Sequence, residues 1–320
     1  MLLNETAERI RTMEIRGAGR IARAAVEALA GYADTLDATD LAAFRSGMQE
    51  AAETLLATRP TAVSLPNAVH AVMAPLSAAD SLPEARDAVR RRADAFVTSS
   101  LHAVERIADI GARHISDGDT VLTHCNSEAA LACILEAHRQ GKDLTVYATE
   151  VRPRNQGHLT IRALDDAGIR TSFIIDSAVR SIMNRITLVV VGADAITVNG
   201  AVVNKIGTAQ IALAAHEART NVVVAAETYK FAPRTVLGEL IEIEERSPAE
   251  VLPEEIARTL KHVTVRNPAF DVTPAEYVDL IVTEKGAIPP ELAYTIIREY
   301  LGWNIEDFQR QLVLDHRNQD

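Results

Sequence analysis

Apolar positions follow two different patterns along the chain, and the pattern changes just before residue 118. In the first part they recur every three to four residues, which is typical of amphipathic helices with one buried face. Gly17 and Gly19 interrupt the first helical stretch, and Pro83 suits the first turn of the last one. The spacing predicts an all-helical domain. Its helices are expected over residues 4–30, 38–57, 67–78 and 82–115.

In the second part, short continuous runs of Val, Ile and Leu alternate with helical patterns. Such runs are typical of strands buried on both faces, so they predict a mainly parallel sheet with helices on both sides. The strands are expected over residues 120–123, 144–149, 171–175, 187–191, 222–226 and 280–283. The fold class is therefore α/β. We expect a helical N-terminal domain over residues 1–116 and a Rossmann-like domain over residues 117–320.

Polar residues stand directly after several of these strands, where an open parallel sheet binds its ligands. Cys125 lies between the first strand and a helix, so we expect the helix dipole to lower its thiol pKa and to attract an anion. Asp194 follows the fourth strand, and Lys205 precedes a second helix start. The sequence thus places a thiol, a carboxylate, two helix N-termini and several cations at one edge of the sheet.

Composition narrows the class of protein. The net charge of −11 argues against binding to nucleic acid, which requires a basic surface. No stretch approaches the roughly 18 apolar residues of a membrane span, and no cleavable signal segment begins the chain, so we expect a cytoplasmic protein without membrane contact. The two cysteines, Cys125 and Cys133, are eight residues apart, about 12 Å on a helix, which is too far for a disulfide.

Several common sites have no counterpart in the sequence. No GxGxxG follows a strand, so a dinucleotide is not supported, and there is no GxSxG or Walker sequence. No His, Cys and Glu spacing typical of a metal site occurs either. We therefore predict neither a metal nor a cofactor.

Seven motifs carry a resemblance to a known family. They are RGAGRIARAA (16–25), RPTAVSLPNA (59–68), THCNS (123–127), EVRPRNQG (150–157), GADAI (192–196), NKIGT (204–208) and AETYKF (226–231). In this order and spacing, the chain resembles the family that joins isomerases of ribose 1,5-bisphosphate and methylthioribose 1-phosphate with the regulatory subunits of initiation factor 2B. The resemblance covers nearly the whole chain and implies a helical domain joined to a Rossmann-like one.

The resemblance also implies an activity. In the isomerases, the cysteine of the THCNS-like motif and the aspartate of GAD are the catalytic pair, here Cys125 and Asp194, and regulatory subunits generally lack both. The first two motifs look like those of enzymes acting on ribose 1,5-bisphosphate, because methylthioribose-phosphate isomerases usually have a more apolar residue near Asn67. Two alternatives stay open: methylthioribose-1-phosphate isomerase, and a non-catalytic regulatory subunit. The resemblance further implies a homo-oligomer, dimeric or hexameric, and activation by AMP in nucleoside monophosphate salvage.

The chemistry explains why such a site needs two proton-transferring groups. In ribose 1,5-bisphosphate the anomeric oxygen is esterified, so the ring cannot open as a free hemiacetal does. One group must protonate the ring oxygen while another removes the C2 proton, which gives a phosphorylated enol and then ribulose 1,5-bisphosphate. We expect Cys125 to transfer the C2 proton as a thiolate and Asp194, kept protonated by burial, to protonate the ring oxygen. The reverse assignment stays open.

The substrate's two phosphates require separate anchors. One set comprises Arg16, Gly17, Ala18, Gly19 and Arg59, and the other Ser127, Arg152, Gln156 and Lys205. We expect Asn204 and Lys230 to contact the sugar hydroxyls or the developing enolate charge. Which phosphate each set holds is left open.

Overall fold

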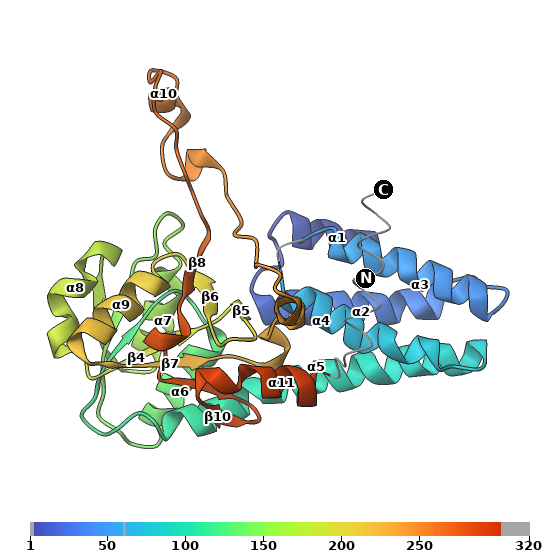
Figure 1. Ribbon diagram of the computed structural model, residues 1–320, viewed down its shortest axis with the longest axis horizontal. Coiled ribbons are helices and arrows are strands. Elements are labelled where there is room, and N and C mark those ends of the chain that lie inside the picture. The colour runs from blue at the N-terminus through green and yellow to red at the C-terminus, as the bar shows by residue number, and fades with distance from the viewer. Residues whose placement is uncertain (1–2, 60–61, 302–320) are drawn as a thin grey trace.

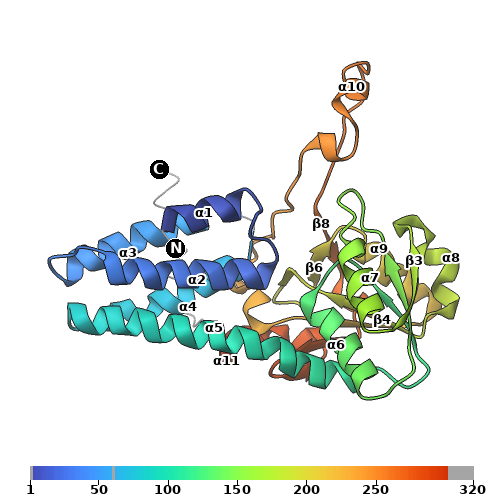
Figure 2. The ribbon, with the colours of Figure 1, turned by 180° about the vertical axis from the view of Figure 1, so that it is seen from behind.

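The computed structural model describes residues 3–59 and 62–301, and its first part is helical (Figures 1 and 2). The helices are α1 (Leu3–Arg11), α2 (Ala18–Thr35), α3 (Leu41–Leu56), α4 (Ser64–Met73), the short η1 (Ala74–Ser77) and α5 (Leu82–Ala112). The helical stretch expected over residues 4–30, with an interruption at its glycines, is two helices, because the chain turns between Thr12 and Gly17, whose φ of 92° lies in the left-handed region that glycine tolerates. The helix expected from residue 67 begins earlier, at Ser64.

Helix α5 runs through both parts of the molecule (Figure 2). Its 31 residues begin after Ser81, whose hydroxyl accepts the N–H of Glu84, and Pro83 lies in its first turn. At about 1.5 Å per residue the helix is about 46 Å long. One end packs against α2 and α4, and the other packs against α6 (Glu128–Arg139) and the sheet. None of the described helices combines the length and the apolar character needed to span a membrane.

The expected sheet is confirmed. Seven strands lie in the order β10-β9-β7-β4-β1-β2-β3, and all neighbours are parallel except β10 and β9. The strands are β1 (Thr120–Thr123), β2 (Thr145–Thr149), β3 (Arg170–Ile174), β4 (Leu188–Gly192), β7 (Asn221–Ala225), β9 (Leu280–Thr283) and β10 (Gly286–Ile288). The six expected strands are within one residue of the observed ones. The three-residue β10 has no apolar run to reveal it.

Successive side chains of the central strand β4 enter two different apolar clusters, one on each face of the sheet. Val189 and Val191 pack with Ile211 of α9 (Thr208–Ala218), while Val190 packs with Ile134 of α6. This two-sided burial explains why the strands read as continuous apolar runs. The remaining helices are α7 (Gly157–Asp166), α8 (Val179–Ile182), α10 (Glu254–Ala257) and α11 (Ala293–Tyr300), with short η2 (Asp176–Ala178), η3 (Met183–Arg185), η4 (Thr228–Lys230), η7 (Ala275–Tyr277) and η8 (Pro290–Leu292).

Two features were not predicted. A small antiparallel sheet, β5-β6-β8, lies beside the large one, with strands β5 (Ala195–Ile196), β6 (Val202–Lys205) and β8 (Phe270–Thr273). A long segment, residues 238–269, leaves η5 (Pro233–Leu237), passes η6 (Pro248–Glu250), carries α10 at its tip and returns into β8 (Figure 1). We call it the projecting segment. The domain division at residues 116 and 117 stays a prediction.

Candidate active site

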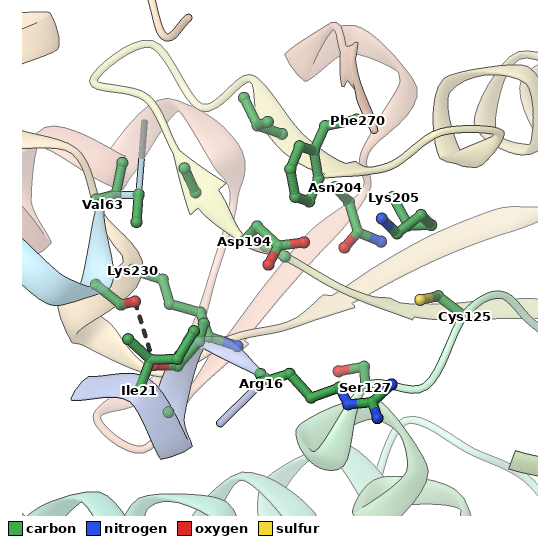
Figure 3. Close-up of a pocket in the computed structure, with 18 of the residues that line it drawn as sticks. Arg16, Ile21, Val63, Cys125, Ser127, Asp194, Asn204, Lys205, Lys230 and Phe270 are labelled. Carbon is green, nitrogen blue, oxygen red and sulfur yellow. Dashed lines mark hydrogen bonds between the residues drawn. The ribbon is translucent and has the colours of Figure 1, made fainter. Parts of the chain in front are cut away.

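A cavity of about 470 Å³ lies where the strands of the large sheet end, facing the start of α2 and the base of the projecting segment (Figure 3). Twelve of the thirteen residues expected at the site line it, and Arg152 does not. Cys125 and Asp194, the expected pair, lie in this same cavity. The lining residues expected from sequence are Arg16, Gly17, Ala18, Gly19, Arg59, Cys125, Ser127, Gln156, Asp194, Asn204, Lys205 and Lys230.

The turn after β1 directs the thiol into the cavity. Cys125 has a φ of 67°, a left-handed conformation that is uncommon for a residue with a side chain. Its carbonyl accepts a hydrogen bond of 2.7 Å from the Thr160 hydroxyl of α7, and its Sγ lies 3.8 Å from Oε1 of Gln156. Backbone strain of this kind clusters at functional sites, where the surrounding contacts hold it in place.

His124, which was not expected at the site from sequence, holds this turn in place through its ring. Its fully buried ring donates from Nε2 to the Ile206 carbonyl at 2.9 Å, and Nδ1 accepts from the Thr149 hydroxyl at 2.6 Å. Burial lowers the pKa of this imidazole, so it stays neutral. The ring thereby connects the end of β1 to the loop that leaves Lys205.

The expectation of a lowered thiol pKa is wrong. Helix α6 begins only at Glu128, and its N-cap Ser127 uses its hydroxyl to accept the N–H of Ala130, so Cys125 precedes the helix by three residues. Although the cavity leaves Cys125 partly accessible, protein surrounds it closely, and this desolvation raises the pKa of the thiol to about 11. The nearby Lys205 cation opposes the shift but does not cancel it. At neutral pH the thiol holds its proton.

Asp194 lies between β4 and β5, and its carboxyl group points into the cavity (Figure 3). Its N–H donates to the Val203 carbonyl at 2.9 Å, which ties the turn to the small sheet. Burial raises the pKa of this carboxyl above its usual range, in the expected direction. Four cations oppose the rise. In order of effect they are Lys230, Lys205, Arg59 and Arg246.

The cavity is cationic although the chain is acidic. Among the described residues that line it, seven are cationic and four carry carboxyl groups, against a net charge of −11 for the whole chain. The cations are Arg16, Arg20, Arg59, Arg154, Lys205, Lys230 and Arg246; the carboxyls are Glu128, Asp194, Glu227 and Glu242. This excess suits a ligand with more than one negative charge.

Carboxylates of the projecting segment pair with the arginines of the cavity. Glu244 lies 2.7 Å from Arg59 and 3.3 Å from Arg246, and all three side chains are at most one quarter exposed. Glu250 accepts from Nε of Arg154 at 2.9 Å. Arg246 was not expected from sequence, because it lies in a segment without periodicity or motif. These pairs hold the guanidinium groups in place at the cavity wall.

Arg152 lies outside the cavity, and its neighbour Arg154 lines it instead. The cause is Asp176, whose carboxylate accepts the N–H groups of Val151 at 2.9 Å and of Arg152 at 2.8 Å. This fixes the loop with Val151 buried and the Arg152 side chain exposed. The expected contact between Arg152 and a phosphate is therefore not supported.

Two of the helix N-termini expected to bind anions, the starts of α9 and α2, differ from each other. At the start of α9, Asp271 of β8 accepts the N–H of Gly207 at 2.7 Å and of Ala209 at 3.2 Å, so the protein's own carboxylate occupies that position. At the start of α2, Gly17 is the N-cap and has no side chain to bond the free N–H groups of the helix, and residues 16–19 line the cavity. The start of α2, which was expected to hold a phosphate through the amides of Gly17, Ala18 and Gly19, therefore stays a candidate anion site.

The chain is similar to known proteins over nearly its whole length. The sequence model of the initiation factor 2 subunit family matches residues 14–290 of the chain. A ribose 1,5-bisphosphate isomerase of Methanocaldococcus jannaschii is 55% identical over 94% of this chain and 96% of its own length. One from Archaeoglobus fulgidus is 55% identical over 99% and 98%.

More distant relatives share the architecture. A methylthioribose-1-phosphate isomerase of Desulforamulus reducens is 36% identical over 90% of this chain and 88% of its own length. The crystal structure of translation initiation factor eIF-2B from Pyrococcus horikoshii OT3 superposes with a TM-score of 0.77 at 33% identity, covering 90% of this chain and 97% of that one. Among the residues that the structure describes, no group of three His, Cys, Asp or Glu side chains is arranged to hold a metal ion.

Proposed function

Since this chain belongs to the initiation factor 2 subunit family, we propose that it isomerises ribose 1,5-bisphosphate to ribulose 1,5-bisphosphate. The observation that carries the proposal is one cavity that contains both Cys125 and Asp194 and has an excess of cations. A regulatory subunit needs no such pair. The higher identity to the ribose 1,5-bisphosphate isomerases than to the methylthioribose-1-phosphate isomerase favours a substrate with two phosphates.

The pKa directions support the reverse of the roles expected from sequence. With a pKa of about 11 the Cys125 thiol keeps its proton and can donate it. Burial raises the pKa of Asp194 as well, but four cations, Lys230, Lys205, Arg59 and Arg246, oppose the rise and favour its carboxylate. A pKa displaced towards the working pH also suits a general base. We therefore assign the C2 proton to Asp194 and the ring oxygen to Cys125.

The reaction then proceeds in two balanced steps. The Asp194 carboxylate takes the C2 proton, the C1–O bond of the ring breaks, and Cys125 protonates the departing ring oxygen, which leaves a phosphorylated enol. Next, Asp194 returns its proton to C1 while the Cys125 thiolate accepts the proton of the 2-hydroxyl, giving the ketone. Both side chains end in their starting state, and the nearby Lys205 cation stabilises the transient thiolate.

The two phosphates need anchors at opposite ends of the sugar. One is the start of α2, where the amides of residues 17–19 face the cavity beside Arg16. In Figure 3 Arg16 points towards Ser127, at the start of α6, so these two elements form one wall. We place the other anchor at Arg59, Arg154 and Arg246, whose bonds to Glu244 and Glu250 the phosphate would replace.

Three further properties belong to the proposal and have their own tests. We propose that the protein is cytoplasmic and forms a homo-oligomer, dimeric or hexameric. Light scattering of the purified protein measures the number of subunits. We also propose activation by AMP as part of nucleoside monophosphate salvage, which the same assay with and without AMP measures.

The decisive experiment supplies ribose 1,5-bisphosphate and methylthioribose 1-phosphate side by side and follows products by phosphorus NMR. We expect conversion of the bisphosphate, and a loss of about 10²- to 10⁴-fold in turnover for Cys125→Ser and for Asp194→Asn. Conversion of only the thioether sugar would establish the first alternative. No conversion of either sugar by the folded protein, with AMP present, would reject both isomerase activities and favour the regulatory subunit.

A further inference from the structure

We infer that Glu227 is a positioning residue, whose carboxylate holds the ammonium group of Lys230 and thereby keeps Lys230 from pairing with Asp194. Lys230 and Glu227 both line the cavity, and they lie at the two ends of the turn that follows β7. Their Nζ and Oε2 atoms are 2.6 Å apart, and their side chains are only 9% and 3% exposed. The inference rests on the role proposed above for Asp194.

A chain of buried hydrogen bonds fixes the Glu227 carboxylate. The Tyr229 hydroxyl donates to Oε1 of Glu227 at 2.9 Å and accepts from the Ser100 hydroxyl at 3.2 Å. Arg23 of α2 in turn donates to Ser100 at 3.0 Å. The carboxylate therefore has one oxygen for Tyr229 and the other for Lys230, and its position depends on residues from α2 and α5.

Gly19 allows α2 to approach this cluster. A Cβ atom at Gly19 would lie 2.8 Å from the Tyr229 hydroxyl, which is too close, and 3.5 Å from Oε1 of Glu227, so any side chain there would displace the Tyr229 hydroxyl that holds Glu227. The second glycine of the RGAGR motif thus has a reason independent of phosphate binding. It lets the anion-binding end of α2 and the carboxylate of Glu227 share one corner of the cavity.

The charge balance explains why this pair matters for Asp194. Two carboxyl groups, Glu227 and Asp194, face one buried ammonium group, and a buried ammonium without a partner is unfavourable by several kcal/mol. With Glu227 present, Lys230 already has a carboxylate partner, and the pKa of Glu227 lies below its usual range while that of Asp194 lies above it. Without Glu227, the carboxyl group with the larger effect on Lys230 is Asp194, ahead of Glu128, so ionisation of Asp194 becomes the main way to neutralise Lys230.

Other charges also face Asp194 and stay constant in the comparison. They are Lys205 from β6, Arg59 from the loop before α4, Arg246 from the projecting segment, and the thiol of Cys125 from the turn after β1. Glu128 of α6 faces Lys230. None of these groups bonds to Glu227 in the described residues, so a change at Glu227 acts first through Lys230.

The test measures the titration of Asp194 directly in the full-length protein. Aspartate is labelled with ¹³C at the carboxyl carbon, and the signal of Asp194 is identified by its loss in Asp194→Asn. We expect Glu227→Gln to lower the pKa of Asp194 by about one to three units, the usual effect of a new opposite charge at close range. The double variant Glu227→Gln with Lys230→Met should return the titration close to that of the unmodified protein.

Tyr229→Phe is the matched control, because it removes a hydrogen bond from Glu227 but no charge. It should move the titration by less than Glu227→Gln does. An unchanged Asp194 titration in Glu227→Gln, or an equal shift in Tyr229→Phe, overturns the inference. If Glu227→Gln does not fold, Glu227→Asp decides, because it keeps the charge but draws the carboxylate back from Lys230: a lowered Asp194 pKa supports the inference and an unchanged one rejects it. The measurement needs no substrate, so its outcome is separate from that of the isomerase assay.

Discussion

The thiol of Cys125 should react slowly with iodoacetamide at neutral pH, because burial raises its pKa to about 11. Only the thiolate reacts. At pH 7 a thiol with this pKa is ionised in about one molecule in 10⁴, whereas a free cysteine with a pKa of about 8.5 is ionised to about 3%. The thiolate fraction of a free cysteine is therefore about 300 times that of Cys125. A thiolate of higher pKa is more nucleophilic, which recovers about tenfold and leaves Cys125 about 30-fold slower.

Peptide mass spectrometry measures the alkylation rate of Cys125 separately from that of Cys133, with glutathione as the free-thiol reference. Limited access to the cavity could also slow the reaction, so the pH dependence is the sharper measurement. We expect the rate to rise about tenfold per pH unit from pH 7 to 10, since the thiolate fraction does so below the pKa. Lys205→Met should slow it further, because this cation favours the thiolate.

A plateau above about pH 8 would refute the argument. It would show a thiol of ordinary or lowered pKa, and the roles of Cys125 and Asp194 would return to those expected from sequence. Rapid labelling at pH 7 that Lys205→Met abolishes would mean that the lysine outweighs desolvation, contrary to the order of effects given above.

Two further predictions concern the neighbouring elements. Burial raises the pKa of Asp271 to about 6, so the stability that its protonated form contributes is present below about pH 4 and is lost as the pH rises through 6. Asp271→Asn does not lose this contribution. Between pH 4 and 8 the unfolding free energy of Asp271→Asn should therefore rise by about 1 to 3 kcal/mol relative to that of the unmodified protein, as measured by urea denaturation. Equal pH dependence in both proteins would contradict this. Arg154→Ala should raise the Michaelis constant about tenfold, while the matched Arg152→Ala changes it little, in steady-state assays; the opposite order would mean that the loop rearranges around substrate.

The large sheet could be predicted from sequence because each of its strands is buried on both faces, and the residue at each strand end could then be read directly. This is how Cys125 and Asp194 were placed at one edge. The small sheet was missed for a physical reason: β5 has two residues and β8 is only partly buried, so neither carries an apolar run. Asn199 and Gly200 form the turn that joins β5 to β6, but a turn sequence alone does not reveal such short strands on either side of it.

The electrostatic errors have a common origin. Sequence shows which residue types are close to a helix start, but not how much protein surrounds them, and desolvation is the largest cause of the raised thiol pKa of Cys125. It also cannot show that Asp271, sixty-two residues beyond Ala209, would occupy the start of α9. Arg246 was hidden in the same way, since the projecting segment reaches the cavity only through tertiary structure.

Helix α5 connects the two parts of the molecule that form the cavity, so its rigidity affects the distance between them. The helix supports α2 at one end and the sheet at the other, and these elements carry opposite walls. A displacement of about 1 Å between such walls can lower an enzyme's rate by about 10²-fold. The helix has no proline after its first turn that would kink it, so it keeps a fixed distance between the start of α2 and the strand ends that carry Cys125 and Asp194.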